Sequence, residues 1–116
     1  MKLYKPKIVD KPWGRELWVA MEEEYGGKIL EMKKGFTTSL HYHSKKKETI
    51  YVLKGELQVY TPEKTYVIEP GESITIEPND VHRLEAKTDV VLIEFSTPEL
   101  GETVRMEDYY DRENRK

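Results

Sequence analysis

Tight-turn residues recur at short intervals along this 116-residue chain and leave little room for long helices. Each turn contains Pro, Gly or Asn, the residues that fix or permit the backbone angles of tight turns. The turns fall at 26–27, 54–55, 61–64, 70–71 and 78–80. No segment between them repeats its apolar residues with the period of a helix. The sequence therefore predicts an all-β protein.

The segments between the turns are short and rich in residues that favour strands. Strands are expected at 16–20, 28–33, 39–43, 48–54, 56–61, 66–69, 73–77, 82–85 and 90–96. So many short strands in a small chain must close into a barrel or jelly roll to bury their apolar faces and edges. We expect one domain over residues 1–116, with a core barrel at about 14–97. The charged tail, 98–116, is expected to form at most a short helical turn with a frayed end.

The charge distribution limits the partners of the chain. The formal net charge is −3, and acidic and basic residues are interspersed, so no basic surface for nucleic acid or an anionic membrane is expected. No apolar run reaches the length of a transmembrane helix, and the N-terminal segment lacks the apolar stretch of a signal peptide. These features favour the cytoplasm, with small molecules or other subunits as partners.

Two of the three histidines, His41 and His43, lie one residue apart in an expected strand. Side chains two apart on a strand project to the same face, so both imidazoles can share one metal ion while Tyr42 points away. The chain has no cysteine, so a metal would have to be held by His, Asp, Glu or backbone oxygen.

Two further ligands are expected from neighbouring strands. Glu48 begins the strand after the histidine pair, and His82 follows a turn from which a facing strand can bring it to the same place. Ile50 and Val52 share the parity of Glu48 and should form an apolar floor beneath it. Three imidazole nitrogens and one carboxylate oxygen suit one divalent ion, Zn, Mn, Fe, Co or Ni, with positions left open to water or substrate.

The spacing of these residues resembles a known pattern. Gly35-x5-His41-x-His43-x4-Glu48-x6-Gly55 matches the first motif of the cupin superfamily at every fixed position. The resemblance implies a single-domain cupin, a double-stranded β-helix or jelly-roll barrel, with its metal on His41, His43, Glu48 and His82.

The second cupin motif is matched by Gly71 and His82. Its usual Pro, second Gly and final Asn are replaced by Glu77, Asn79 and Ala86, and Asn tolerates the left-handed backbone better than other non-glycine residues.

A narrower resemblance covers nearly the whole chain. DKPWGRELWVA, SLHYHSKKKETIYVLKGEL, HRLEA, VVLIEFSTPELGE and VRMEDYYDR occur in the order seen in the cupin domain of type II mannose-6-phosphate isomerases and their small stand-alone relatives. The resemblance implies an isomerase that interconverts aldose and ketose sugar phosphates through a divalent metal and an enediolate. His41 stands where that group usually has Gln, which leaves metal binding intact.

The same resemblance suggests two phosphate contacts. The lysine run at 45–47 reads most simply as a solvated loop. Lys46, however, matches an Arg of the isomerase group, and Arg105 lies in the matching tail, where a guanidinium can bind phosphate in bidentate fashion. Lys46 and Arg105 are therefore candidate substrate-binding residues.

Other functions suit the same ligand set. A non-catalytic module could bind a carbohydrate or another small molecule, and an Fe(II) dioxygenase could use the same residues. An isomerase also needs a base for the carbon-bound proton. The sequence does not rank its candidates, which are Tyr42, Tyr60, Lys54, Arg83 and Arg105.

The assembly expected from the sequence is a homodimer. A small barrel of this kind leaves strand edges open, and pairing them between two subunits would cover them. Trp13 and Trp18 are expected to be core or subunit-contact residues because tryptophan buries a large apolar surface.

Overall fold

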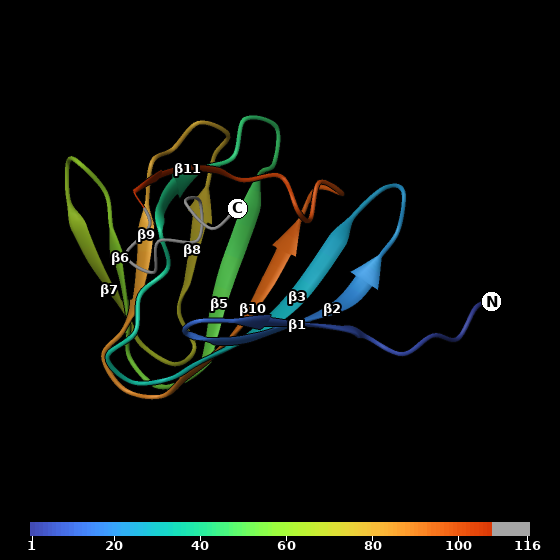
Figure 1. Cartoon of the computed structure of the whole chain (residues 1–116), viewed down its shortest axis with the longest axis horizontal. Coiled ribbons are helices and arrows are strands. Elements are labelled where there is room, and N and C mark those ends of the chain that lie inside the picture. The colour runs from blue at the N-terminus through green and yellow to red at the C-terminus, as the bar shows by residue number, and fades with distance from the viewer. Residues whose placement is uncertain (108–116) are drawn as a thin grey trace.

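The computed structural model describes residues 1–107, and within them it contains strands and no helix (Figure 1). The predicted all-β class is therefore confirmed. The strands in chain order are β1 (Lys7–Lys11), β2 (Gly14–Met21), β3 (Gly26–Met32), β4 (Leu40–Tyr42), β5 (Glu48–Lys54), β6 (Leu57–Tyr60), β7 (Thr65–Ile68), β8 (Ser73–Ile76), β9 (Arg83–Ala86), β10 (Val90–Ser96) and β11 (Val104–Glu107).

The strands form a jelly roll in which all pairings are antiparallel. A six-stranded sheet has the order β1-β2-β3-β10-β5-β8, and a three-stranded sheet has the order β7-β6-β9. A short pair, β11-β4, continues the smaller sheet, because isolated bridges join Thr37 to Glu85 and His41 to His82. The two curved layers enclose a common interior.

Each expected strand coincides with one of the strands from β2 to β10. β1 and β11 were not expected. The helical turn expected in the tail is wrong for residues 104–107, because this segment pairs with β4 and so satisfies its backbone groups as a strand. Residues 108–116 of the predicted tail lie outside the described residues.

The apolar core fills the interior between the two larger sheets. Ile50 and Val52 are fully buried, as predicted, and Trp13 is a core residue with 2% of its surface exposed. The other members of the core cluster are Leu30, Met32, Leu57, Val59, Ile68, Ile76, Leu84, Ala86, Val90 and Leu92.

The turn before β9 fixes the place of the third histidine. Asn79 has a φ of 71°, in the left-handed region, so it adopts the conformation for which the cupin motif usually has glycine. Its backbone N–H donates to the carbonyl of His43 at 2.7 Å. The turn is thereby tied to the chain that carries the other two histidines. Among residues 1–107, no helix exists that could span a membrane.

Candidate metal centre

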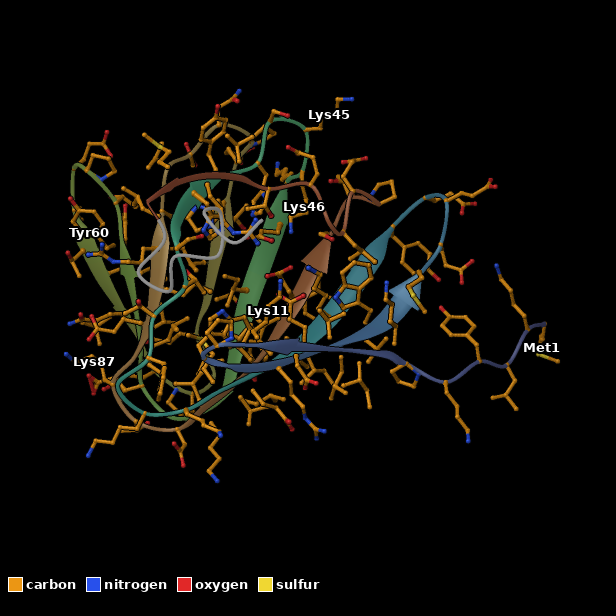
Figure 2. All side chains as sticks on the ribbon, viewed as in Figure 1. Met1, Lys11, Lys45, Lys46, Tyr60 and Lys87 are labelled. Carbon is orange, nitrogen blue, oxygen red and sulfur yellow. The ribbon has the colours of Figure 1, made fainter. Side chains whose placement is uncertain are left out.

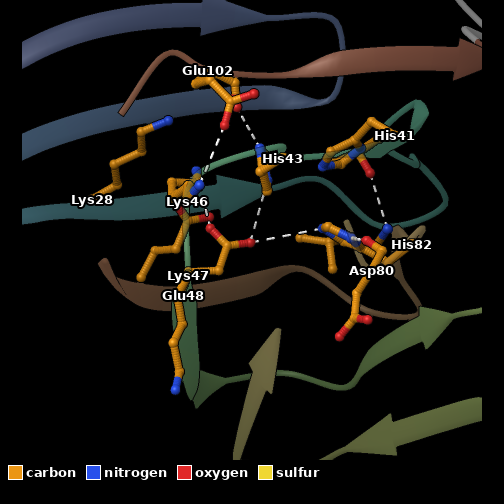
Figure 3. Close-up of polar contacts among 12 residues, drawn as sticks. Lys28, His41, His43, Lys46, Lys47, Glu48, Asp80, His82 and Glu102 are labelled. Carbon is orange, nitrogen blue, oxygen red and sulfur yellow. Dashed lines mark hydrogen bonds and ion pairs between the residues drawn. The ribbon is translucent and has the colours of Figure 1, made fainter. Parts of the chain in front are cut away.

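Three buried histidines converge where β4 meets the chain entering β9 (Figure 3). The backbones of His41 and His82 exchange two hydrogen bonds, at 3.0 and 2.9 Å. His43 follows β4 on the same face as His41, as predicted. One ligand nitrogen from each ring lies within 4.8 Å of the other two, so the three imidazoles could hold one metal ion.

The hydrogen bonds of the three rings fix their tautomers. Each Nδ1 lies against a backbone carbonyl: that of Ser39 at 2.7 Å for His41, that of Glu102 for His43, and that of Asp80 at 2.8 Å for His82. A carbonyl can only accept, so each Nδ1 carries a proton and each Nε2 is the ring nitrogen left to bind a metal. The Nε2 of His82 is buried without a hydrogen-bond partner among the described residues.

Burial also favours the neutral rings that metals bind. It lowers the pKa of His41 to about 3, and it lowers the pKa of His82. A neutral imidazole with Nδ1–H bonded to a carbonyl and a free Nε2 is the usual state of a metal-bound histidine. The donor chemistry of this site therefore fits a divalent metal.

Glu48 lies beside two of the histidines, on the inner face of β5. Its Oε1 is 3.6 Å from Nε2 of His43 and 3.7 Å from Nε2 of His82. Although burial raises the pKa of this carboxyl, His43 and the charge of Lys46 lower it more, so the pKa lies below its usual range. An ionised carboxylate oxygen thus lies near Nε2 of His43 and Nε2 of His82. The role of Glu48 as a fourth metal ligand stays a prediction.

Lys46 is not part of a solvated loop. Lys45 and Lys47 are exposed, whereas 1% of the surface of Lys46 is exposed, and Figure 2 shows Lys45 at the tip of the loop with Lys46 inside it. The Nζ of Lys46 lies 3.0 Å from Oε2 of Glu48 and 3.4 Å from Oε2 of Glu94. Burial lowers the pKa of Lys46, but the two carboxylates raise it above its usual value, so the ammonium stays charged.

A row of buried charges continues from Lys46 across the large sheet. Glu94 of β10 lies opposite Lys28 of β3, and Lys28 is 3.2 Å from Oε1 of Glu16. The same Oε1 accepts a hydrogen bond from Nε1 of Trp18 at 2.8 Å. Burial and the nearby Glu48 raise the pKa of Glu94 to about 7.

Sequence reasoning missed Glu16, Lys28 and Glu94, since charged residues in strands are assigned to the exposed face by default. The alternation of inward and outward side chains along a strand would have identified two of them as buried. Glu94 alternates with the buried Leu92 and Val90, and Lys28 alternates with the buried Leu30 and Met32.

The row holds three carboxyl groups, Glu16, Glu48 and Glu94, and two ammonium groups, Lys28 and Lys46. Pairing of opposite charges offsets part of the cost of burying them.

The inner cavity is small. It has a volume of about 60 Å³ and is lined by the three histidines, the charged row, Lys11 and Arg105. Small-molecule sites usually occupy roughly 300–1,000 Å³, so this space suits an ion with a few waters. A larger hollow of about 510 Å³ lies between the β6–β7 turn and β8, and His82 also contributes to its lining.

Arg105 reaches the cavity from β11, where it is paired with His41. Its Nε is buried and has no hydrogen-bond partner in the part of the chain that the structure describes. The other base candidates, Tyr42, Tyr60, Lys54 and Arg83, do not line this cavity.

Comparisons with known proteins agree with the fold. The Cupin domain family model matches residues 28–96, more than half of the chain, so this protein belongs to the cupin family. An RmlC-like cupin from Shewanella frigidimarina superposes with a TM-score of 0.74 at 23% identity, over 83% of this chain and 86% of the other.

Two curated relatives have sugar-related names. Mannose-1-phosphate guanylyltransferase RfbM of Salmonella typhimurium is 34% identical over 93 residues, which is 77% of this chain and 19% of the relative. Alginate biosynthesis protein AlgA of Pseudomonas aeruginosa is 33% identical over 109 residues, 90% of this chain and 23% of the relative. The chain therefore spans about a fifth of the length of these relatives.

Proposed function

We propose that this protein is a metal-dependent isomerase that interconverts the aldose and ketose forms of a sugar phosphate, with mannose 6-phosphate as the first substrate to test. The observation that carries the proposal is the convergence of three buried histidines and the Glu48 carboxylate beside Arg105. The similarity to the two sugar-related relatives supports the substrate class.

In this proposal His41, His43, His82 and Glu48 would hold one divalent ion. When bound, such an ion polarises a carbonyl oxygen and stabilises the negative charge that develops on it. Arg105 would bind the phosphate, since its guanidinium lines the cavity and its Nε is unpartnered among the described residues. Lys46, the other sequence-predicted contact, would face substrate from inside the cavity through an ammonium already held by two carboxylates.

Moving a proton between C1 and C2 needs a group that can take it up and return it. Glu94 is the carboxylate best placed for this task, because it lines the cavity beside Lys46 and is 6% exposed. The 60 Å³ of free space admits the reacting end of a sugar at most. The phosphate would therefore lie toward the mouth, where Lys11, Thr103 and Arg105 line the cavity.

The test is an isomerase assay on Zn- or Mn-loaded protein in deuterated water. Formation of fructose 6-phosphate, with solvent deuterium at C2 of recovered mannose 6-phosphate, is the expected result. If neither appears, isomerisation is wrong. Saturable sugar binding by calorimetry without turnover would then favour a binding module, and oxygen uptake by Fe(II)-loaded protein would favour a dioxygenase.

We also propose that the protein is a homodimer in the cytoplasm. β1 and β8 form the two edges of the large sheet, and β1 carries the exposed apolar side chain of Ile8, so a second subunit could pair with this edge. Light scattering should give twice the 13.7 kDa mass of the chain. A monomer mass at micromolar concentration would refute the dimer.

A further inference from the structure

The three histidine rings differ in what holds them. His41 and His82 donate to carbonyls two residues earlier in the chain, so their own backbone sets their orientation. The partner of His43 is the carbonyl of Glu102, 59 positions away. The orientation of His43 therefore depends on the segment that crosses from β10 to β11.

The side chain of Glu102 fastens this segment to the loop after β4. Its Oε2 accepts hydrogen bonds from the N–H and the hydroxyl of Ser44, both at 2.9 Å. Its Oε1 accepts from the N–H groups of Lys45, at 2.8 Å, and Lys46, at 3.3 Å. Successive backbone N–H groups of this kind form a concave site for an anionic oxygen.

We propose that Glu102 is a positioning residue for the metal centre: its carboxylate holds the loop at 44–46 while its carbonyl orients His43. The inference rests on the proposed metal site. It also explains how Arg105, three residues further along, is held over the cavity, since the same anchor precedes β11. The charged tail thus contributes to the site through residues that carry no metal-ligand signature.

The test is nuclear magnetic resonance of protein labelled with ¹⁵N-histidine, with and without Zn²⁺. Each Nδ1–H that is hydrogen-bonded and buried should give a slowly exchanging signal. In Glu102→Ala we expect the His43 signal to be lost and those of His41 and His82 to remain. Zn²⁺ affinity, measured by competition with a chelator, should fall about 10- to 100-fold, as for other partners of metal-bound histidines.

The matched control is Glu99→Ala, which removes a carboxylate of the same segment that accepts from Thr97 at 2.9 Å. It should leave all three signals and the affinity unchanged. Glu102→Gln keeps one acceptor oxygen and should lie between wild type and Glu102→Ala, which preserves the test if the alanine variant folds poorly.

A retained His43 signal and wild-type affinity in Glu102→Ala would overturn the proposal. Equal losses in the Glu102 and Glu99 variants would also overturn it, because they would indicate general loosening of the segment. Wild-type protein that binds no Zn²⁺ would refute the metal site instead. The signals of the metal-free protein would still test the orientation of His43.

Discussion

Three neighbouring strands of the large sheet each bury an apolar side chain near one end and a charged one near the other. β3 contributes Leu30 and Lys28, β10 contributes Leu92 and Glu94, and β5 contributes Val52 and Glu48. The apolar floor gains free energy from burial, whereas buried charges are costly unless they are paired. The two ends of these strands therefore differ: the apolar end forms the floor of the barrel, and the charged end lines the cavity beside the histidines.

Lys46→Met should give the largest change and would test the charged half. It leaves Glu48 and Glu94 without their shared counter-ion, and loss of one partner of a buried ion pair lowers the free energy of unfolding by about 3–5 kcal/mol. Urea unfolding would measure it. Lys47→Met is the control, since Lys47 is exposed, and it should change stability by about 0.5 kcal/mol or less. Equal effects of the two variants would contradict the buried network.

Leu92→Ala would test the floor. Leu92 is fully buried, and such truncations lower the free energy of unfolding by about 2–5 kcal/mol through lost burial and a cavity. Metal bound per folded chain should stay at the wild-type value, because the side chain does not line the metal cavity. If folded Leu92→Ala protein lost its metal, the claim that the apolar floor and the metal site are independent would be wrong.

A smaller effect is expected at the turn that joins β8 to β9 and is tied to His43. Asn79→Ala should lower the free energy of unfolding by about 1–2 kcal/mol, because the φ of 71° disfavours residues with an ordinary Cβ. Asn79→Gly should preserve stability or raise it slightly, since glycine adopts this conformation freely. Thermal unfolding would compare the two variants, and equal melting temperatures would argue against a left-handed Asn79.

The smallest effect concerns pH. Slight burial raises the pKa of Glu102, but hydrogen bonds from the amides of Lys45 and Ser44 outweigh it and lower the pKa to about 2, below its usual 4.5. A carboxyl with a lowered pKa in the folded state stabilises above its unfolded pKa and loses that contribution as the pH falls. The melting temperature of wild type should therefore exceed that of Glu102→Gln near pH 6, and the difference should shrink between pH 4.5 and pH 2. A constant difference would contradict this account.

The apolar floor and the histidine cluster could be predicted from the sequence because both follow local rules. Turn residues separate the strands, parity puts Ile50 and Val52 inside, and motif spacing brings His41, His43, Glu48 and His82 together. These features need no knowledge of distant contacts.

The charged half could be predicted only in part. Lys46 looks like its neighbours in a lysine run, and its burial depends on Glu94, 48 positions away. β11 and the anchor at Glu102 likewise depend on pairing with β4 and its loop, which no local pattern shows. Contacts between polar residues that lie far apart in the chain therefore could not be predicted from the sequence.

Elemental analysis of the purified protein tests the central claim most directly. Wild type should carry about one divalent ion per chain, and His43→Ala and His82→Ala should lose most of it because each removes an Nε2 of the cluster. Tyr42→Phe, between the two β4 histidines and outside the residues that line the cavity, should retain the ion. Wild-type protein that stays metal-free after incubation with Zn²⁺, Mn²⁺ and Ni²⁺ would contradict the account.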